Sequence, residues 1–342
     1  MSTPLRVGMV SFAHSTHPER YLAALVADER VEVVGISDPD TERARPHAER
    51  HQVPLVADHL ELMDRCDAVV ICSEYVEHAP LVLAAVARGL HVLCEKPLGL
   101  DDETMAGMVA AVEQSTAVFM MALPCRYLAP VRRARELYLA GEIGELVGIA
   151  ATNRGACPDG WFLDPARSGG GALMDHSAHI ADLVRWITGN EIATVHAFAG
   201  SNLLDIDVED SGAVTVVMSD GVHATIDTSW SRTGDLPATF DVSLRLVGTE
   251  GSLHVDALSQ RIEVHAARTS WHVHGGSMDD AMVDDFVTAV LTGAPSPIGV
   301  VDGWRASQVA LAAYRSLASG QPEPLDPRTG DLEPTTSPLA RR

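Results

Sequence analysis

The sequence predicts an α/β protein of two domains. The first is a doubly wound parallel sheet, and the second is an α/β domain with a large open, mostly antiparallel sheet. Two patterns predict this fold: short apolar runs alternate with helical segments up to residue 123, and segments of alternating polarity follow. With 342 residues, 46% of them hydrophobic, the chain is long enough for two cores. We expect domains at 1–123 and 124–320, with the last helix packing back on the first domain, and a Pro-rich tail at 321–342.

Continuous apolar runs of four to eight residues are typical of parallel strands that are covered on both faces. In the first domain the expected strands are 5–12, 31–38, 55–58, 67–73, 90–95 and 117–123. The expected helices are 19–28, 40–51, 60–66, 78–89 and 101–115. Strands and helices in this order predict a Rossmann-type sheet that binds a dinucleotide.

In the second domain, alternation of apolar and polar residues indicates strands with one buried face. Phe240, Val242, Leu244 and Leu246 share one face of a run, and Ala224, Ile226 and Trp230 share one face of another. The other face of this sheet is a candidate contact between subunits. The expected helices are 129–144, 171–189, 278–293 and 303–320, and a further strand is expected at 146–155.

Charge and cysteine usage limit the function classes. A formal net charge of −22 repels nucleic acid and anionic membranes, so small molecules and other copies of the chain are the expected partners. The N-terminus lacks the features of a signal peptide and no apolar run approaches the roughly 20 residues of a membrane span, which predicts a cytoplasmic protein. The five cysteines are isolated and predict reduced core thiols rather than disulfides.

The first strand-to-helix turn, "SFAHST", carries none of the glycines of the G-x-G-x-x-G pattern, whose positions fall on Ser11, Ala13 and Thr16. Hydroxyls of Ser11, Ser15 and Thr16, together with His14, are able to donate hydrogen bonds to a phosphate at a helix N-terminus. The alternative is that this turn has lost phosphate binding.

Asp38 ends the second strand about 20 residues after the turn, where a carboxylate accepts both adenosine ribose hydroxyls and repels a 2′-phosphate. This position favours NAD over NADP. The alternative is that Asp38 only caps the following helix.

Lys96 is the one lysine of the chain, and every other fixed cation is an arginine. The pKa of a lysine ammonium falls readily on burial, so a lysine is able to exchange protons where an arginine is not. A GC-rich coding bias accounts for the arginines, and a single lysine surviving by chance is the alternative to a catalytic role.

Asp175, His179 and Asp182 follow three glycines, 169–171, at spacings that put them on one face of a helix. A carboxylate beside an imidazole orients it and supports its protonation, and such a pair with a lysine is able to move a hydroxyl proton. The three glycines suggest a ligand approaching the backbone closely. An ordinary surface pair on a helix is the alternative.

Together these residues resemble the glucose-fructose oxidoreductase, inositol dehydrogenase and MocA (Gfo/Idh/MocA) family over nearly the whole chain. The resemblance rests on "RGLHVLCEKPLGL", on His78 before it, on "CRYLAP" and on "GGGALMDHSAHIADL". The chain departs from the family pattern at the glycine-free turn and at "CSEYVEH", where Ser73, Glu74 and Tyr75 replace the usual Thr-Pro-Asn.

The resemblance implies that Lys96 and His179 contact the reacting oxygen, with Asp175 beside them, and that Glu95 and Pro97 shape the nicotinamide ribose site. It also implies oligomers, a homodimer or homotetramer, formed through the second sheet. The cofactor-binding residues expected from the motifs and the resemblance are Ser11, Phe12, Ala13, His14, Asp38, Ser73, Glu74, His78, Glu95 and Lys96.

The expected activity is hydride transfer between NAD and a carbinol or ketone of a sugar, cyclitol or related polyol. Candidate substrate contacts are Arg126, Asn153, Arg154, Trp161 and Arg167. No H-E-x-x-H or C-x-x-C pattern occurs, so no metal is expected. Two alternatives stay open: a lyase, epimerase or glycosidase that recycles tightly held NAD, and a non-catalytic sensor with a degenerate dinucleotide site.

Overall fold

The computed structural model describes residues 3–14, 16–232, 240–258, 261–265, 269–273 and 275–325; for 261–265 and 269–273 it describes the backbone. Ser15 and most of the expected tail lie outside these residues. The chain divides into two compact units. Unit 1 comprises Met1–Tyr127, Pro158–Gly169 and Gly276–Ser307, and unit 2 comprises Leu128–Cys157, Gly170–Gly275 and Gln308–Arg342.

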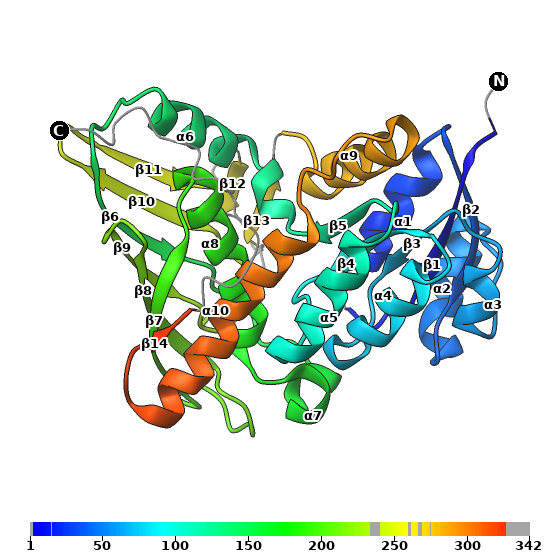
Figure 1. Cartoon of the computed structure of the whole chain (residues 1–342), viewed down its shortest axis with the longest axis horizontal. Helices are drawn as coiled ribbons and strands as arrows, with labels where there is room; N and C mark the ends of the chain where they lie inside the picture. The colour runs from blue at the N-terminus through cyan, green and yellow to red at the C-terminus, as the bar shows by residue number, and fades with distance from the viewer. Residues whose placement is uncertain are drawn as a thin grey trace. The chain divides into compact units, whose positions relative to one another are not determined.

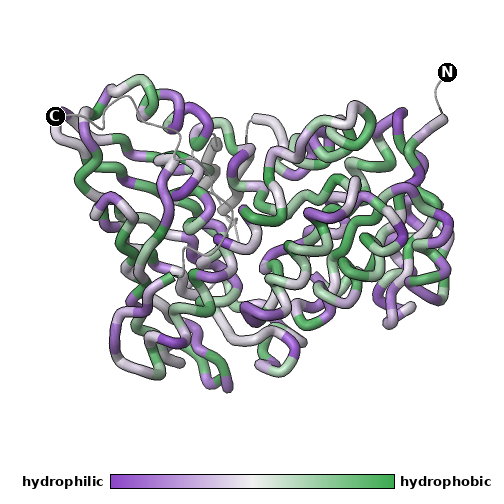
Figure 2. The backbone as a smooth tube through the Cα atoms, in the orientation of Figure 1, coloured by the Kyte–Doolittle hydropathy of each residue, from purple (hydrophilic) through white to green (hydrophobic). Residues whose placement is uncertain are grey.

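Unit 1 is built on a five-stranded parallel sheet in the order β2-β1-β3-β4-β5. Its strands are β1 (Leu5–Val10), β2 (Val31–Ser37), β3 (Ala68–Ile71), β4 (His91–Glu95) and β5 (Phe119–Ala122). All residues of β3 and β5 are buried, which confirms that the continuous apolar runs are strands covered on both faces. Figure 2 shows the apolar colour following these strands.

The expected strand at 55–58 is wrong. Leu55 makes only an isolated bridge with Ile36, and Asp58 caps α3 (His59–Met63) by accepting a hydrogen bond from the Glu61 N–H at 2.9 Å. Because the helix begins directly after Asp58, the run is too short to form a sixth strand.

Helices lie on both sides of this sheet. Figure 1 shows α1 and α9 together on one side and α4 and α5 together on the other. The helices of unit 1 are α1 (His17–Ala27), α2 (Thr41–His51), α3 (His59–Met63), α4 (His78–Val86), α5 (Asp102–Glu113), α7 (Pro165–Ser168) and α9 (Met278–Thr292), with short 3-10 helices η1 (Tyr75–Glu77), η2 (Pro124–Tyr127) and η3 (Gly160–Leu163).

Two later segments belong to unit 1, although a single division at residue 123 assigns them to the second domain. Helix α9 packs on α1 and on η2, and Arg20 Nη1 lies 3.3 Å from Asp279 Oδ2. Pro158–Gly169 is in the same unit. Of α10 (Val300–Ser319), the residues up to Ser307 are in unit 1 and the rest in unit 2.

Unit 2 contains a seven-stranded sheet in the order β11-β10-β6-β9-β8-β7-β14, in which β6 and β9 are parallel and the other neighbours antiparallel. This confirms the open, mostly antiparallel sheet. Its strands are β6 (Leu146–Thr152), β7 (Ile192–Gly200), β8 (Ser211–Met218), β9 (His223–Asp227), β10 (Ser243–Gly248), β11 (Ser252–Asp256) and β14 (Glu323–Pro324). Strands β12 (Arg261–His265) and β13 (Thr269–Val273) pair separately.

One face of the large sheet is buried under helices. Val242, Leu244, Leu246, Ala224 and Ile226 are at most 2% exposed, as the alternation predicts. Helix α8 (Ala172–Thr188) packs against β7, β8 and α6 (Ala129–Leu139). In the described part of the chain, no helix is both long and apolar enough to cross a membrane.

Candidate functional site

The first turn of unit 1 holds a glycine-like conformation without a glycine. Ser11 has φ +68°, in the left-handed region that non-glycine residues rarely adopt. Its N–H donates to Ser37 O at 2.8 Å, and its Oγ accepts from the Ala13 N–H at 3.2 Å. Ser11 therefore stands at the first glycine position in the conformation that the pattern needs, held there by hydrogen bonds.

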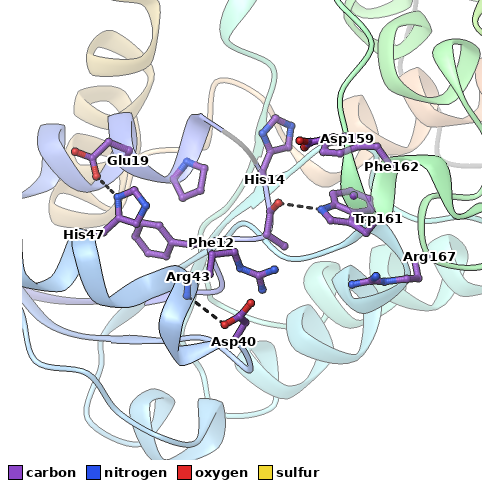
Figure 3. Close-up of a pocket in the computed structure, with 13 residues that line it drawn as sticks. Phe12, His14, Glu19, Asp40, Arg43, His47, Asp159, Trp161, Phe162 and Arg167 are labelled. Carbon is purple, nitrogen blue, oxygen red and sulfur yellow. Dashed lines mark hydrogen bonds and ion pairs between the residues drawn. The ribbon is translucent and has the colours of Figure 1, made fainter. Parts of the chain in front are cut away.

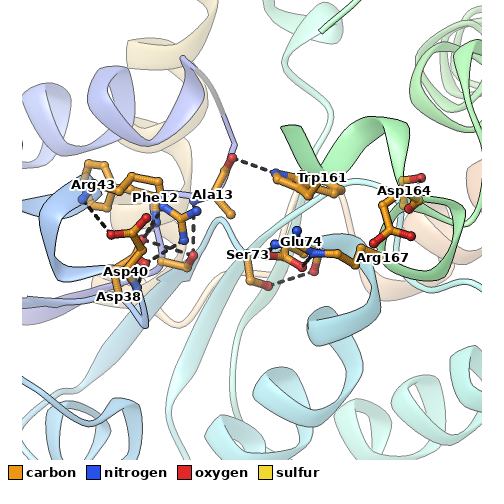
Figure 4. A network of polar contacts seen from close by, with 12 residues as sticks. Phe12, Ala13, Asp38, Asp40, Arg43, Ser73, Glu74, Trp161, Asp164 and Arg167 are labelled. Atoms are coloured by element: carbon orange, nitrogen blue, oxygen red, sulfur yellow. Dashed lines mark hydrogen bonds and ion pairs between the residues drawn. The ribbon is translucent and has the colours of Figure 1, made fainter. Parts of the chain in front are cut away.

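Asp38 holds this turn to the end of β2. Its buried carboxylate accepts from Phe12 N–H at 2.5 Å, from Ser11 Oγ at 3.4 Å and from Asp40 N–H at 2.7 Å. Arg43 donates from Nε at 3.1 Å and from Nη2 at 2.7 Å (Figure 4). Asp38 does not cap α2, because the N-cap is Asp40, which accepts from the Arg43 N–H. Instead, five donors of its own chain converge on Asp38.

A pocket of about 470 Å³ opens beside the turn (Figure 3). It is lined by Phe12, Ala13, His14, Pro18, Glu19, Asp40, Arg43, His47, Asp159, Gly160, Trp161, Phe162 and Arg167. The walls therefore come from the turn, from α1, from the end of β2 with α2, and from the segment Pro158–Gly169. This is the edge of a parallel sheet at which such folds bind their ligands.

The structure places Trp161 and Arg167 with the expected cofactor residues. Trp161 Nε1 donates to Ala13 O at 2.9 Å. Arg167 pairs with both carboxylate oxygens of Glu74, with Nε 2.6 Å from Oε2. Ser73, beside Glu74, donates from Oγ to the Glu74 carbonyl at 3.2 Å. Two residues expected at a substrate therefore line the pocket of the first turn, because Pro158–Gly169 folds into unit 1.

Arg126 has a structural position. Its side chain is 7% exposed, and its guanidinium donates to Asp302 Oδ1 at 3.0 Å and to Pro297 O at 3.2 Å. It thereby ties η2 to the segment that enters α10. Its expected contact with a substrate stays a prediction.

Glu95 is the buried acid at the end of β4. Its Oε1 lies 2.7 Å from His17 Nδ1 and accepts from Tyr21 Oη at 2.7 Å. Burial of Glu95 opposes its ionisation. The interactions with His17, His14 and Lys96 outweigh burial and hold the pKa of the Glu95 carboxyl well below its usual range. Sequence reasoning missed His17 and Tyr21; their i,i+4 spacing on α1 was the available signal.

His14 stacks on His17, with ring centroids 4.1 Å apart and planes 15° apart. One ligating atom each from His14, His17 and Glu95 lie within 4.8 Å of one another, as in a site for a metal ion. However, Glu95 Oε1 is already engaged by His17 and Tyr21, and near-parallel stacked rings do not direct two lone pairs at one ion. We interpret His17, Tyr21 and Glu95 as a hydrogen-bonded group on which the His14 ring stacks, and the absence of a metal stays a prediction.

Lys96 follows Glu95, and the bond between Lys96 and Pro97 is cis. The lysine is 2% exposed, and its Nζ lies 3.2 Å from Tyr75 Oη. His78 supports this segment from α4, because its Nδ1 donates to Pro97 O at 2.6 Å. His78 is fully buried, and burial lowers the pKa of its imidazole. His78 therefore contacts the segment after Lys96 and is not among the residues that line the pocket.

In unit 2, Asp175 and His179 lie on α8 and are each 8% exposed, so they are not an ordinary surface pair. Asp175 Oδ2 accepts from Trp230 Nε1 at 3.1 Å and lies 3.2 Å from His176 Nε2. Sequence reasoning did not single out His176. Its partner Thr228 and the Asp175 donor Trp230 follow strand β9, and no local pattern places them beside α8.

The glycines before α8 are approached by the chain's own atoms. A Cβ on Gly170 would lie 1.9 Å from Tyr314 Oη, and one on Gly171 would lie 2.1 Å from Glu209 O. The Glu209 carboxylate accepts from the N–H groups of Gly171 and Leu173 at 3.0 Å, where a negative charge stabilises the helix N-terminus. At Gly170 and Gly171, the atoms that come close to the backbone therefore belong to the protein itself, whereas a ligand was expected there.

Asn153 and Arg154 follow β6 and both bind Asp241. Arg154 Nη2 lies 2.6 Å from Asp241 Oδ2, and Asn153 Nδ2 donates to Asp241 O at 2.9 Å. Burial opposes ionisation of Asp241, but the Arg154 hydrogen bond outweighs it and lowers the pKa of that carboxyl. The Arg154 side chain is 41% exposed, so part of it stays accessible.

Two family models match this chain. Residues 5–123 match "Oxidoreductase family, NAD-binding Rossmann fold", and residues 131–254 match "GFO/IDH/MocA C-terminal domain". The chain belongs to the GFO/IDH/MocA oxidoreductase family. Its first unit is accordingly an NAD-binding Rossmann domain, which confirms the resemblance seen in the E-K-P and D-x-x-x-H motifs.

Relatives in this family align along most of the chain. "Uncharacterized oxidoreductase YrbE" of Bacillus subtilis (strain 168) is 26% identical over 85% of this chain and 89% of its own length. Inositol 2-dehydrogenase of Rubrobacter xylanophilus is 29% identical to this chain, and the match covers 89% of this chain and 87% of that protein. The crystal structure of GenD2 from gentamicin A biosynthesis in complex with NAD has a TM-score of 0.87 and 26% identity, covering 95% of this chain and 97% of that one.

Proposed function

We propose that this family member is an NAD-dependent oxidoreductase that transfers a hydride between nicotinamide and a carbinol or ketone of a sugar, cyclitol or related polyol. The observation that carries the proposal is the sole lysine, buried at the end of β4 in an NAD-binding Rossmann unit with its ammonium beside the Tyr75 hydroxyl. The similarity to inositol 2-dehydrogenase supports the polyol class.

The first turn fits a dinucleotide despite its missing glycines. Ser11 adopts the left-handed conformation, and the Thr16 side chain leaves the start of α1 uncapped. N–H groups at a helix start bind phosphate, and His14 and His17 stack where a pyrophosphate would approach. The residues proposed to hold the cofactor are Ser11, Phe12, Ala13, His14, Asp38, Ser73, Glu74, Glu95 and Lys96, with His78 supporting Lys96 from behind. NAD supplies the hydride acceptor.

We place Trp161 and Arg167 with the cofactor as well, because both line the pocket of the turn. NAD is preferred over NADP in this proposal. A 2′-phosphate at the end of β2 would meet the carboxylates of Asp38 and Asp40, while the Arg43 guanidinium is already neutralised by Asp38. A ribose hydroxyl, in contrast, is able to replace a donor of Arg43 on Asp38.

For proton transfer we retain the roles that the resemblance to the family implies. Lys96 and His179 contact the reacting oxygen: one removes the hydroxyl proton, and the lysine ammonium stabilises the developing alkoxide. Asp175 orients the imidazole. Asn153 and Arg154 remain the candidates for contacts with substrate hydroxyls.

We also propose that the exposed face of the large sheet joins subunits into a homodimer or homotetramer. Phe198 on β7 is 64% exposed, and Val217 on β8 and Val247 on β10 are 37% and 38% exposed. Apolar side chains on the solvent side of a sheet are typical of a surface that another protein covers.

The test is a panel of cyclitols and sugars with NAD and NADP, followed by nicotinamide absorbance. We expect turnover with NAD. Lys96→Met should lower kcat by about 10²–10⁴-fold while NAD affinity, measured by calorimetry, stays within a few-fold. Lys96→Arg is the matched control: it keeps the charge and loses the exchangeable proton, so it should stay impaired.

Wild-type turnover in Lys96→Met would remove Lys96 from the proposal. If the folded protein bound neither NAD nor NADH at millimolar concentration, the whole proposal would fall. Turnover without net release of reduced cofactor would instead favour a lyase, epimerase or glycosidase that recycles NAD.

A further inference from the structure

Tyr75, in the segment that departs from the family pattern, contacts the sole lysine of the chain. Lys96 Nζ donates a hydrogen bond to Tyr75 Oη at 3.2 Å and lies 5.5 Å from the centre of the Tyr75 ring. Both residues are buried, with 1% of Tyr75 and 2% of Lys96 exposed. The asparagine of the family pattern is shorter by the length of the ring, so from the same backbone it would not reach Nζ. The contact is therefore made by the side chain in which this sequence departs from the pattern.

The tyrosine hydroxyl holds the ammonium without neutralising it. An ammonium donates and does not accept, so Tyr75 Oη is the acceptor of this bond. The carboxylate next to the lysine in sequence, Glu95, has other donors. Its Oε1 meets His17 and Tyr21, and its Oε2 accepts from a backbone N–H at 3.2 Å. A neutral acceptor leaves the charge of Lys96 available to a developing alkoxide, whereas an ion pair would compensate it.

The Tyr75 ring is held by other rings, and these fix the place of its hydroxyl. Its centre lies 4.8 Å from that of Trp161, and the two planes are nearly perpendicular, at 84°. Phe162 packs against it at 5.8 Å and 87°. Edge-to-face contacts at such distances are favourable. Because Trp161 Nε1 also donates to Ala13 O, the same rings join the lysine to the wall of the first-turn pocket.

We propose that Tyr75 is a positioning residue for Lys96, whose ammonium it holds in one place through a hydroxyl fixed by the packing of its ring. The inference rests on the proposed function, in which Lys96 contacts the reacting oxygen. A lysine has a long, flexible side chain, so its end needs an immobile partner to stay aligned with a substrate. Displacing a reacting group by about 1 Å is enough to lower a rate about 100-fold. Loss of the hydroxyl should therefore affect kcat more than it affects binding.

The first test observes the ammonium and needs no turnover. Because Lys96 is the one lysine, the full chain labelled with ¹⁵N-lysine gives a single Nζ signal. Tyr75→Phe keeps the ring and removes only the hydroxyl, so the Nζ signal should shift and the ammonium protons should exchange faster with water. Tyr138→Phe is the matched control, because it makes the same change in a half-buried residue of α6, and it should leave the signal where it is.

An unchanged Nζ signal in Tyr75→Phe would overturn the proposal. If this variant does not fold, Tyr75→Leu, which also lacks the hydroxyl, takes its place.

The second test shows whether the hydroxyl acts through the lysine. Tyr75→Phe should lower kcat by about tenfold or more, while KM and the NAD affinity from calorimetry stay within about twofold. Added to Lys96→Met, the same substitution should lower kcat by less than about twofold, because the group that Tyr75 positions is already gone.

Equal losses of kcat on the wild-type and on the Lys96→Met background would show that Tyr75 acts independently of the lysine and would contradict the proposal. Wild-type kcat in Tyr75→Phe would contradict it as well. If the wild type has no turnover with any member of the substrate panel, the proposed function fails, and the Nζ signal still decides whether Tyr75 holds Lys96.

Discussion

The two buried acids of the candidate site in unit 1 each have a partner from a distant part of the sequence. Glu95 meets His17 and Tyr21, and Asp38 meets Phe12 and Arg43. Burying a charge is costly unless it is paired and hydrogen-bonded, and the partners of Glu95 hold the pKa of its carboxyl well below its usual range. The chemistry of the site therefore depends on contacts that no local motif contains.

Asp38→Ala tests the coenzyme preference at the residue scale. Removing the carboxylate takes away the negative charge at the end of β2 and releases the Arg43 guanidinium, which is then able to bind a 2′-phosphate. We expect the ratio of kcat/KM for NADP to that for NAD to rise by about tenfold or more. Asp40→Asn, which keeps the cap of α2, should change the ratio less. An unchanged ratio in Asp38→Ala would show that coenzyme choice lies elsewhere.

At the scale of elements, single side chains join helices and strands to one another. The Glu19 carboxylate of α1 binds Arg50 Nη1 at 2.7 Å and His51 Nε2 at 3.1 Å, and it also contacts His47, all on α2. At the N-terminus of α8, the Gly171 N–H donates to both Glu209 and Tyr314, and the Tyr314 hydroxyl donates to Glu209 Oε1 at 2.6 Å. Such ties determine how the elements pack, whereas apolar periodicity determines only which face is buried.

Glu19→Gln should show a stability loss that depends on pH. Burial opposes ionisation, but His47, His51 and Arg50 outweigh it and lower the pKa of Glu19 to about 2. A depressed pKa stabilises the fold above the unfolded value, near 4.5, and the contribution is lost as pH falls through the folded value. We expect denaturant unfolding to give a loss of about 1–2 kcal/mol at neutral pH that shrinks below about pH 4.

Glu42→Gln is the control for this measurement, because Glu42 is exposed and pairs with Arg45 on its own helix. It should change stability little at any pH. An equal loss in Glu19→Gln at neutral and acid pH would argue against an ionic tie between α1 and α2.

Gly171→Ala tests why a glycine precedes α8. The added Cβ would lie 2.1 Å from the Glu209 carbonyl oxygen, a backbone atom that cannot turn aside. We expect a loss of about 3 kcal/mol or more in thermal or denaturant unfolding. Gly107→Ala, at an exposed position of α5 where an added Cβ meets nothing within 4 Å, should stabilise the protein by about 0.5–1 kcal/mol. Equal effects of the two substitutions would contradict this account.

At the scale of the whole molecule, two units are assembled from interleaved segments, and the large sheet of unit 2 has one face covered by helices and one exposed. Phe198, Val217 and Val247 on the exposed face are the basis of the proposed assembly. A sheet face that remains in water does not need large apolar residues, so these positions point to a second copy.

Phe198→Glu should therefore yield a smaller species than the wild type in light scattering. A charge in an apolar interface is left without a partner, whereas on a free surface it is harmless. Leu139→Glu is the matched control, because it also replaces an exposed apolar side chain by a charge but lies on helix α6 rather than on the sheet face, so it should leave the mass unchanged. Identical masses for wild type and Phe198→Glu would refute this face as the interface.

Much of the fold was predictable because its signals are local. Apolar runs and helical periodicity indicated the strands of both sheets, and the E-K-P and D-x-x-x-H motifs indicated the family that the comparisons confirm. The failure was the run at 55–58, which forms one bridge and a helix cap instead of a strand. The placement of Trp161 and Arg167 beside the first turn depends on the path of the chain, which local patterns do not give.

The sequence by itself determined the elements, the fold class, the family and the lone lysine, because each follows from residue type and short-range spacing. Tertiary structure alone decided that His176 lies between Thr228 and Asp175, that Glu95 meets His17, and that Glu209 covers the start of α8. These are pairings between side chains whose positions depend on the path of the chain, and hydrogen bonds need atoms within about 3 Å, which spacing along a sequence does not specify.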